Sequence, residues 1–424
     1  MTRLTWLNSS LLIGERIIVL LLSFTSALLM ARYAGAELFG LFSAIVSLGS
    51  LFLIFTQMGL NSVASKYFSL YPNSSAYYMQ AALLIRLLFS TIAIPFAFLS
   101  GLFIWDLNKA ILVALLVTLQ IGNALNVTEF YFIAKHSVIK PLIPRLLIKL
   151  VCKTALILAI IFELPLSIWV ALVGLEYLCI AFAYLLLLRQ KQVHLHNVFS
   201  TTKNIRRGMY LLFHRGKWLA LSSLAAIIYL KIDQVMLATM VGDKEVAYYA
   251  AAAKLSEFWY VLPVLVSNVL MPRLVELYKT QISHYWHLQR WLYFYSTVIA
   301  SLVAILMMLL AKPLIILLFT DEYLPSVPIL QIHILGCLFI FSRAFMSKWL
   351  VLSNHHKLSL YSHAFGALSN IFLNWFLIPI FGGIGAAIAS VVSYCIASIG
   401  FMFFFKSTRE YLLKILPKCF RPNS

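Results

Sequence analysis

Apolar stretches of similar length alternate with short polar segments along the whole chain. Twelve of them have 18–26 residues, and a helix of that length spans a hydrocarbon core of ~30 Å at a rise of about 1.5 Å per residue. They cover residues 10–30, 39–60, 80–104, 109–133, 146–163, 166–188, 218–241, 246–271, 290–311, 326–347, 359–379 and 384–405. This pattern predicts an all-α membrane protein with twelve transmembrane helices.

The connections between these stretches alternate in basic content. The N-terminus, every second connection and the C-terminal tail together hold 23 of the 33 Lys and Arg residues. The remaining connections hold only Arg32, Lys109, Lys244 and Lys312. Because basic residues concentrate in cytoplasmic connections, we expect both termini to be cytoplasmic.

The composition excludes two other classes of protein. Hydrophobic residues make up 62% of the chain and charged residues 11%, against about 25% charged in a typical soluble domain, so a globular cytosolic enzyme is excluded. The net charge of +19 is accounted for by the sorting of basic residues among connections, and we expect no nucleic-acid partner. The stretch Leu11–Met30 is too long for a signal peptide and no small-residue cleavage site follows it, so we expect a retained helix.

No catalytic or cofactor motif stands out. None of the five cysteines has metal-ligand spacing. The chain lacks a Gly-rich phosphate loop with Lys-Ser/Thr, and the exported connections carry no Ser/His/Asp set. These connections reach roughly 15 residues at most, which leaves no room for a catalytic domain. The sequence predicts a protein that is not an enzyme and needs no metal or cofactor.

The two halves of the chain resemble each other. A basic connection, Arg189–Lys217, separates six stretches from six, and residues 31–71 align with residues 238–278 at an offset of 207. Gly35 then meets Gly242, and Asn61 meets Asn268; coincidence among apolar helices is the alternative. We expect two parallel six-helix bundles, residues 1–200 and 201–405, around a central cavity, followed by a cytoplasmic tail, residues 406–424.

Eleven charged residues lie inside or at the edges of the apolar stretches. They are the basic residues Arg16, Arg86, Lys153, Lys231, Lys254 and Arg343 and the acidic residues Glu15, Glu129, Glu176, Asp233 and Glu257. A charge that faces lipid at mid-helix costs roughly 2.5–3.5 kcal/mol. Most of them must therefore pair, reach the headgroups or face an aqueous cavity, which makes them the candidates for function.

Four of these charges are expected near the middle of the membrane. Lys231 and Asp233 lie on the seventh stretch, and Lys254 and Glu257 lie on the eighth. Lys254 and Glu257 are three residues apart and can pair on one helix face. The cluster is either a pair of structural ion pairs or an anion-binding site with neighbouring titratable acids.

Three arginines lie near the predicted cytoplasmic ends of their stretches. Arg16, Arg86 and Arg343 either extend to the inner headgroups or form a cationic entrance. Glu15 points to a different helix face from Arg16. Glu129 has no obvious partner in the sequence and is either a proton carrier or a satisfied packing acid.

Glu176 allows the same two interpretations, and Lys153 is expected at the membrane interface.

Cationic residues in a dry cavity suit a large amphipathic anion such as a lipid-linked pyrophosphate, because Arg binds phosphate in bidentate fashion and Lys acts as a point charge.

Several segments, in this order, resemble bacterial polysaccharide flippases. They are Ala31–Ser43, Leu230–Leu237, Tyr248–Lys254, Pro313–Phe319 and Gly382–Ala389. The chain is similar to the O-antigen (Wzx-type) flippases, in the polysaccharide transporter family of the multidrug/oligosaccharidyl-lipid/polysaccharide exporter superfamily. The resemblance implies a fold like that of MATE exporters and lipid flippases.

It also implies a function and partners. The substrate would be an undecaprenyl-pyrophosphate-linked oligosaccharide, an O-antigen repeat unit for lipopolysaccharide, flipped across the bacterial inner membrane by alternating access. Coupling would use H⁺ or Na⁺ and not ATP, and the partners would be membrane lipids, a polysaccharide polymerase and a chain-length regulator. Lipid II flippases use arginines in their first, second and eighth helices. Here Arg16 and Lys254 match the first and eighth, and the second helix has no match, which argues against lipid II.

The candidate residues then take hypothetical roles. The substrate-binding set is Arg16, Arg86, Lys231, Lys254 and Arg343, and the ion-coupling set is Asp233, Glu257, Glu129 and Glu15. Residues that could select the sugar are Gln120, Asn123, Asn126 and Tyr229. The alternatives are a multidrug antiporter, which should have a more acidic cavity, an O-antigen polymerase or ligase, which should carry a large exported loop, and a non-catalytic scaffold.

Overall fold

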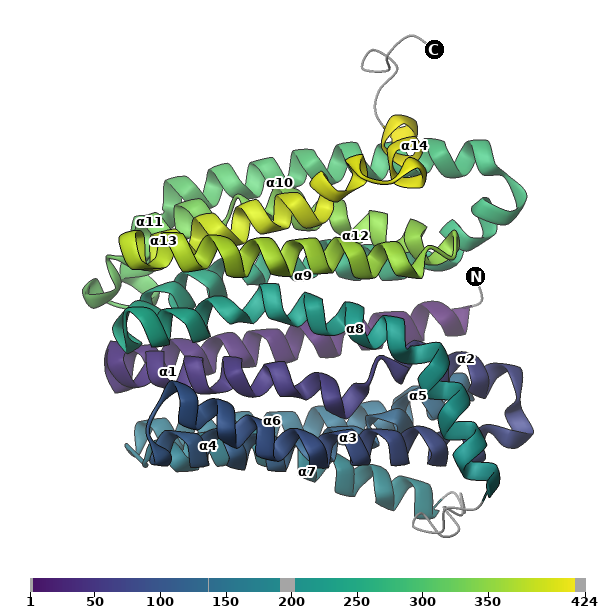
Figure 1. Ribbon diagram of the computed structural model, residues 1–424, viewed down its shortest axis with the longest axis horizontal. Helices are drawn as coiled ribbons and strands as arrows, with labels where there is room; N and C mark the ends of the chain where they lie inside the picture. The colour runs from purple at the N-terminus through teal and green to yellow at the C-terminus, as the bar shows by residue number, and fades with distance from the viewer. Residues whose placement is uncertain (1–2, 136, 191–202, 416–424) are drawn as a thin grey trace. The chain divides into compact units, whose positions relative to one another are not determined.

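The computed structural model describes residues 3–135, 137–190 and 203–415, and the regular structure within these ranges is helical. In chain order the elements are α1 (Arg3–Gln57), α2 (Leu60–Leu70), η1 (Pro72–Ser74), α3 (Ser75–Ile104), α4 (Leu107–Leu119), η2 (Gln120–Asn126), α5 (Val127–Ala134), α6 (Ile139–Ile161) and α7 (Leu166–Gln190). They continue with α8 (Lys203–Met240), α9 (Asp243–Thr280), α10 (Ile282–Leu318), η3 (Asp321–Tyr323), α11 (Ser326–His333), α12 (Gly336–Leu352), α13 (His356–Ser398), η4 (Gly400–Phe403) and α14 (Lys406–Ile415) (Figure 1). Residues 191–202 of the predicted basic connection and 416–424 of the predicted tail lie outside the described residues.

Among the described residues, nine helical segments are long and apolar enough to cross a membrane. Two of these segments are interrupted at a glycine, α1 at Gly35 and α13 at Gly382, and each holds two pieces. α6 is not one of the nine, although it is 23 residues long. The expected all-α, multi-pass membrane protein is confirmed, and the count of twelve transmembrane helices stays a prediction.

Residue contacts divide the chain into a first unit, Met1–Ile227, and a second unit, Ile228–Ser424, with the limit inside α8. In the first unit, α1 packs on α3, α4 and α6, and α7 packs on α4, α6 and η2. In the second unit, α12 packs on α9, α10 and α13, and α11 packs on α9 and α13. The predicted bundle limits, 1–200 and 201–405, stay a prediction, because a division by contacts does not define the extent of a membrane bundle.

Aromatic residues hold together one apolar cluster in each unit. In the first unit, Phe68 of α2 meets Tyr131 of α5 edge to face, with ring centroids 5.9 Å apart. In the second unit, Trp349 of α12 stacks on Tyr411 of α14 at 4.2 Å, beside Leu274 of α9. Offset aromatic contacts of this kind add to the area buried. The stacked pair fixes α14 against the end of the second unit.

Each unit has a break between helices at a glycine with positive φ. Gly35, between the two pieces of α1, has φ 76° and ψ 173°, and Gly242, between α8 and α9, has φ 124° and ψ 174°. A side chain at positive φ would be strained, so glycine suits both positions. The chain reverses direction between the two pieces of α1 (Figure 1). The two glycines are the pair aligned by the offset of 207, so the aligned positions share a conformation as well as a residue type.

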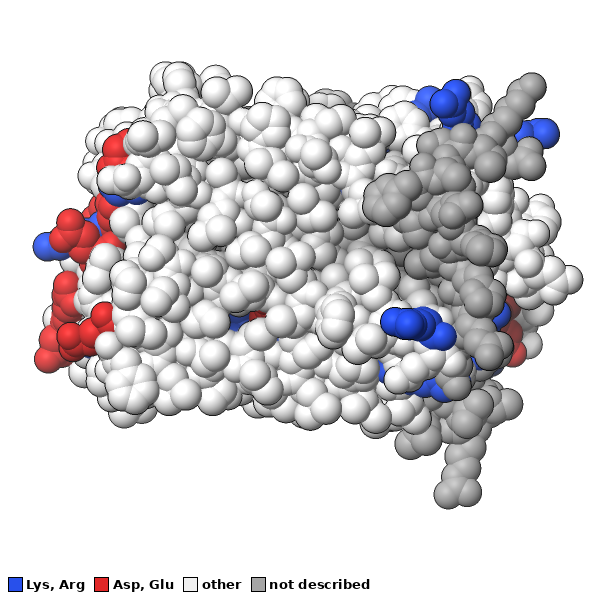
Figure 2. Space-filling view, turned by 90° about the horizontal axis from the view of Figure 1, so that it is seen from below, with Lys and Arg blue, Asp and Glu red and all other residues white. Residues whose placement is uncertain are grey.

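Charged side chains are unevenly distributed on the face drawn in Figure 2. Most of the Asp and Glu on this face gather at one end, others lie at the opposite end beside Lys and Arg, and the broad middle is almost entirely uncharged (Figure 2). An uncharged band between charged ends is the surface that a lipid layer requires. It agrees with a chain that crosses the membrane many times.

Candidate functional site

In the first unit, one arginine joins two buried acids. Nε of Arg145 on α6 donates to Oε1 of Glu15 on α1 at 2.7 Å, and its Nη2 donates to Oε2 of the same carboxylate. Its Nη1 pairs with Oε2 of Glu129 on α5. The three side chains are 5–15% exposed. Glu15 and Glu129 therefore share one cation, and this partner was missed because Arg145 was placed in a connection.

A second ion pair lies on the same helix. Nζ of Lys153 on α6 is 3.4 Å from Oε2 of Glu176 on α7, and both side chains are at most 15% exposed. The charge of Lys153 is held between helices by a carboxylate, and its expected position at the membrane interface stays a prediction. Glu176 has a partner, which supports its interpretation as a packing acid.

Arg86 of α3 is completely buried, at 0% exposure. Its Nη2 donates to Oδ1 of Asn61 on α2 at 2.7 Å. Its Nε and Nη1 have no hydrogen-bond partner among the described residues. Extension of Arg86 to the headgroups is wrong, because the guanidinium ends inside the protein.

Arg343 of α12 is also buried and ties α12 to α13. Its Nη1 donates to Oγ of Ser362 and, at 2.6 Å, to the carbonyl oxygen of Ala397. Its Nη2 lies 2.9 Å from Nε2 of His363. Headgroup contact is wrong for this residue too. Arg16 is exposed on α1 and forms no ion pair with any described residue.

In the second unit, Lys231 and Glu257 form an ion pair between α8 and α9. Nζ of Lys231 donates to both carboxylate oxygens of Glu257, at 3.1 and 3.2 Å. The two side chains are 28% and 27% exposed. Lys254, one turn before Glu257, adds a second positive charge that acts on the same carboxylate. The structure thus brings together three of the four residues expected near the middle of the membrane.

The fourth, Asp233, lies in a separate cage of neutral groups. Its Oδ2 accepts from the Tyr249 hydroxyl and from Oγ of Ser390, both at 2.7 Å. Its Oδ1 accepts from Nδ2 of Asn374 at 2.6 Å. The same Nδ2 lies 3.1 Å from Oδ1 of Asn370, whereas Oδ1 of Asn374 has no partner among the described residues. Within those residues, no Lys, Arg or His forms an ion pair with Asp233.

This cage combines three helices, α8, α9 and α13, and its members are fully or almost fully buried. An unpaired carboxylate at this depth is costly unless hydrogen bonds or a cation stabilise it. Tyr249, Asn370, Asn374 and Ser390 were missed from the sequence. The four-residue spacing of two asparagines within the apolar α13 was the one signal that could have found part of the cage.

A histidine lies next to these groups. Nδ1 of His333, at the end of α11, is 2.6 Å from Oγ of Ser256, and the Tyr260 hydroxyl donates to the His333 carbonyl at 2.9 Å. Both partners are on α9. The rings of His333 and Tyr249 meet edge to face at 5.6 Å. The second unit therefore has a continuous buried polar region around α9.

The predicted sugar-selecting residues lie in two places. Asn123 donates to Oγ1 of Thr56 at 2.5 Å and accepts from Asn126, while Oε1 of Gln120 has no partner among the described residues. This group sits in η2, a 3₁₀ stretch between α4 and α5. Tyr229 belongs to the second unit and stacks on His363 at 5.6 Å. Their role in sugar selection stays a prediction.

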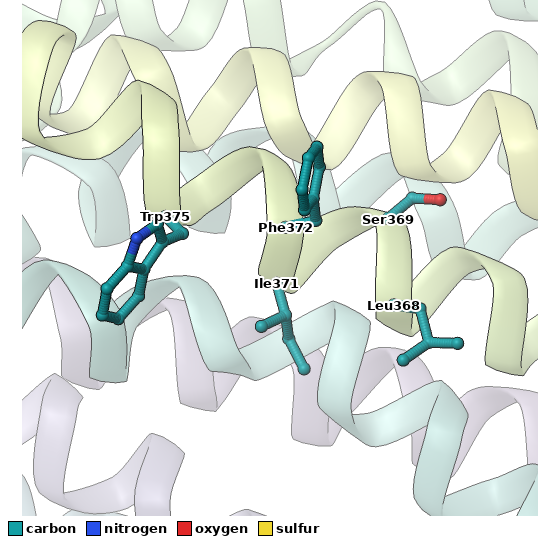
Figure 3. A pocket seen from close by; sticks show the side chains of 5 residues that line it. All are labelled: Leu368, Ser369, Ile371, Phe372 and Trp375. Atoms are coloured by element: carbon teal, nitrogen blue, oxygen red, sulfur yellow. The ribbon is translucent and has the colours of Figure 1, made fainter.

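A shallow hollow on α13 has different chemistry. It is lined by Leu368, Ser369, Ile371, Phe372 and Trp375, which all project from one helix (Figure 3). The lining carries no charge, so it suits hydrocarbon and not a polar ligand. Among the described residues, no group of three or more His, Cys, Asp or Glu side chains could hold a metal ion.

The fold is that of membrane transporters. It matches the lipid II flippase MurJ in an inward closed conformation with a TM-score of 0.70, at 15% identity, over 95% of this chain and 89% of that one. It matches a multidrug resistance MATE family transporter of the MOP superfamily, in an inward-facing conformation, with a TM-score of 0.68, at 13% identity, over 94% and 95% of the two chains. These likenesses define the class of fold.

The sequence defines the family. Residues 5–278 match the family described as "Polysaccharide biosynthesis protein", and the chain belongs to this family. The chain is 25% identical to the capsular polysaccharide biosynthesis protein CapF of Staphylococcus aureus over 189 residues. That match spans 44% of this chain and 48% of CapF, so the chain matches about half the length of this curated relative. The expected family is thus confirmed as one of polysaccharide biosynthesis, and the expected fold like that of MATE exporters and lipid flippases is confirmed.

Proposed function

We propose that the chain flips an undecaprenyl-pyrophosphate-linked oligosaccharide across the bacterial inner membrane, with both termini in the cytoplasm, by cation-coupled alternating access. The family supports a role in polysaccharide biosynthesis, and the fold supports transport. The observation that carries the coupling is the Asp233 cage, a buried carboxylate whose partners are all neutral.

The cage fits a small monovalent cation. It offers the Asp233 carboxylate, the Tyr249 and Ser390 hydroxyls and the amide oxygens of Asn370 and Asn374, and hard cations prefer such oxygen ligands. Nδ2 of Asn374 contacts two oxygens while its Oδ1 lacks a partner among the described residues. The O and N atoms of an amide are told apart by their hydrogen bonds. If the Asn374 amide is turned by 180°, its oxygen faces Asp233 together with the hydroxyl oxygens of the cage. A bound Na⁺ would neutralise Asp233, and a proton on the carboxyl would do the same.

The anion-binding part of the proposal concerns the charges on α8 and α9. Lys231 and Lys254 act on one acid, Glu257, so this group has one positive charge in excess. The three are not fully buried, which leaves them open to a ligand. We assign the pyrophosphate to this group. A phosphate oxygen would take the place of the Glu257 carboxylate beside Lys231, and the Lys231–Glu257 ion pair would then break. Arg16, exposed on α1, is proposed to meet the substrate first.

Arg86 and Arg343 keep a proposed role in substrate binding, but their burial changes its form. Each is held by neutral partners inside its own unit, so either could reach phosphate only after its helix contacts open.

A polysaccharide polymerase and a chain-length regulator are proposed as partners, because a flipped repeat unit must be polymerised to a set length.

The test is deletion of the gene in its native host, followed by assays for surface polysaccharide and for lipid-linked repeat units in inner-membrane vesicles. We expect loss of the polysaccharide, with completed units confined to the cytoplasmic face. Single units that accumulate on the outer face would mean that flipping is intact and that the chain acts in polymerisation.

The cation is tested separately. The purified protein in liposomes should flip a fluorescent short-chain analogue of the lipid-linked sugar faster under an imposed Na⁺ or H⁺ gradient, and only one of the two gradients should act. Equal rates without any gradient would contradict coupling.

A further inference from the structure

Three basic residues form a stripe along α6 in the first unit. Arg145, Lys149 and Lys153 are spaced four residues apart and therefore share a helix face. Like charges at this spacing repel one another and destabilise a helix. The stripe must be stabilised by carboxylates on neighbouring helices, and two of the three cations have them: Arg145 has two and Lys153 has one.

Lys149, in the middle, is different. Neither an ion pair nor a hydrogen bond joins its ammonium group to another side chain in the described parts of the chain. Glu15 and Glu176 act on it electrostatically, as do the two cations on either side. Its side chain is partly exposed. Lys149 is therefore a cation with no committed partner that an external anion can still approach.

The stripe and its carboxylates carry no net charge, but Lys149 is not joined to any of these carboxylates. Arg145 with its two carboxylates carries one net negative charge, the Lys153 pair is neutral, and Lys149 contributes one positive charge. A purely structural Lys149 would form an ion pair with one of the two carboxylates that act on it, Glu176 or Glu15. Glu176 is held by Lys153 and Glu15 by Arg145, which leaves the three ammonium donors of Lys149 available.

We propose that Lys149 is a contact of the first unit for the phosphate of the anionic lipid-linked substrate. This rests on the proposed function and adds a residue on a helix outside the candidate binding set. A Lys ammonium suits a phosphate as a compact point charge. Arg145 and Lys153 are each held by their acids, so Lys149 is the cation of the stripe whose donors, among the described residues, remain open to a phosphate.

Binding of farnesyl pyrophosphate to the purified full chain in phosphatidylcholine nanodiscs tests the proposal by isothermal titration calorimetry. Lys149→Gln should weaken binding about tenfold or more, the usual loss for a charge-assisted hydrogen bond. Lys149→Arg should bind within about threefold of the natural protein, since the charge remains. Lys140→Gln, an exposed lysine on the same helix, is the matched control and should bind normally. If Lys149→Gln is not recovered as a monodisperse protein, Lys149→Met removes the charge and keeps the length.

The outcomes separate this proposal from the proposed function. Tight binding by the natural protein that survives Lys149→Gln overturns the Lys149 contact and leaves the flippase proposal intact. Failure of the natural protein to bind the pyrophosphate overturns both. Nanodiscs that contain phosphatidylglycerol distinguish the source of the phosphate: displacement of the probe by this lipid would mean that Lys149 holds a membrane headgroup, which overturns its assignment to the substrate. Unchanged binding in these nanodiscs supports that assignment.

Discussion

Replacing Asp233 by asparagine removes a buried negative charge and keeps the shape of the side chain. A carboxylate at mid-membrane costs about 3 kcal/mol on insertion scales. The three donors from Tyr249, Ser390 and Asn374 offset that cost, and each loses about 1 kcal/mol when its acceptor is no longer charged. The substitution therefore removes a burial cost of about 3 kcal/mol. It also weakens the three hydrogen bonds by about 3 kcal/mol in total, so the two changes nearly cancel.

We therefore expect Asp233→Asn to change the free energy of unfolding by about 1 kcal/mol or less. Asp233→Ala should cost about 2–4 kcal/mol, because it opens a cavity and loses all three hydrogen bonds. The donors are not left wholly unpaired in that variant, since the Tyr249 hydroxyl is 3.0 Å from Oγ of Ser390 and Ser390 also donates to the Ala386 carbonyl. Thermal unfolding in one detergent at one scan rate compares the variants.

Transport should respond differently from stability. Asp233→Asn should remove the effect of an imposed cation gradient on flipping in liposomes, because the amide cannot gain or lose a charge. Ser393→Ala is the matched control: this buried hydroxyl, one turn after Ser390, donates to the Ala389 carbonyl of its own helix at 2.6 Å and has no bond to another helix among the described residues. A gradient response that survives Asp233→Asn, or an asparagine variant that unfolds as early as the alanine variant, would refute the reasoning.

Five further substitutions, in three groups, test the packing of charges and the repeat. Arg145→Met should cost about 3–5 kcal/mol, because it leaves two buried carboxylates without a cation; a normal yield of folded protein after detergent extraction would contradict this. Lys231→Met should cost only about 1 kcal/mol, since the pair with Glu257 is partly exposed. Adding Glu257→Gln should recover most of that loss in a thermal double-mutant cycle, and additive losses would argue against the pair. Gly35→Ala and Gly242→Ala should each cost about 1–2 kcal/mol through positive φ. Clearly unequal shifts in the melting temperature would argue against equivalent breaks.

The pattern of the sequence predicted the helical membrane fold because each span must satisfy its own backbone hydrogen bonds in lipid. That constraint is local, so hydropathy and length reveal it. It reveals less where a helix is irregular. α6 begins at Ile139, seven residues before the stretch that starts at residue 146, and carries Pro144 inside it. The early start is the reason that Arg145 was assigned to a connection.

The partners of the buried charges could not be predicted. Periodicity places a residue on a face of its own helix, but the partner belongs to a helix elsewhere in the chain: Glu15 and Arg145 are 130 residues apart, and Asp233 and Ser390 are 157 apart. The local rule suggested Lys254 for Glu257, but it could not find Lys231, which donates two hydrogen bonds to the same carboxylate from another helix. The candidate residues could be identified from the sequence because charge in lipid is costly. Their partners could not, because these depend on how distant helices pack.

The one-residue turn at Gly35 affects how the chain is made. With so little backbone between the two pieces of α1, they must integrate from the translocon together, as a hairpin. The first piece carries Glu15, whose cation Arg145 is synthesised 130 residues later. Until then the carboxylate is unpaired, and the apolar second piece supplies the driving force that keeps the hairpin in the bilayer. Extra residues inserted at this turn should therefore reduce the efficiency with which the hairpin enters the membrane during synthesis, even where the mature protein tolerates them.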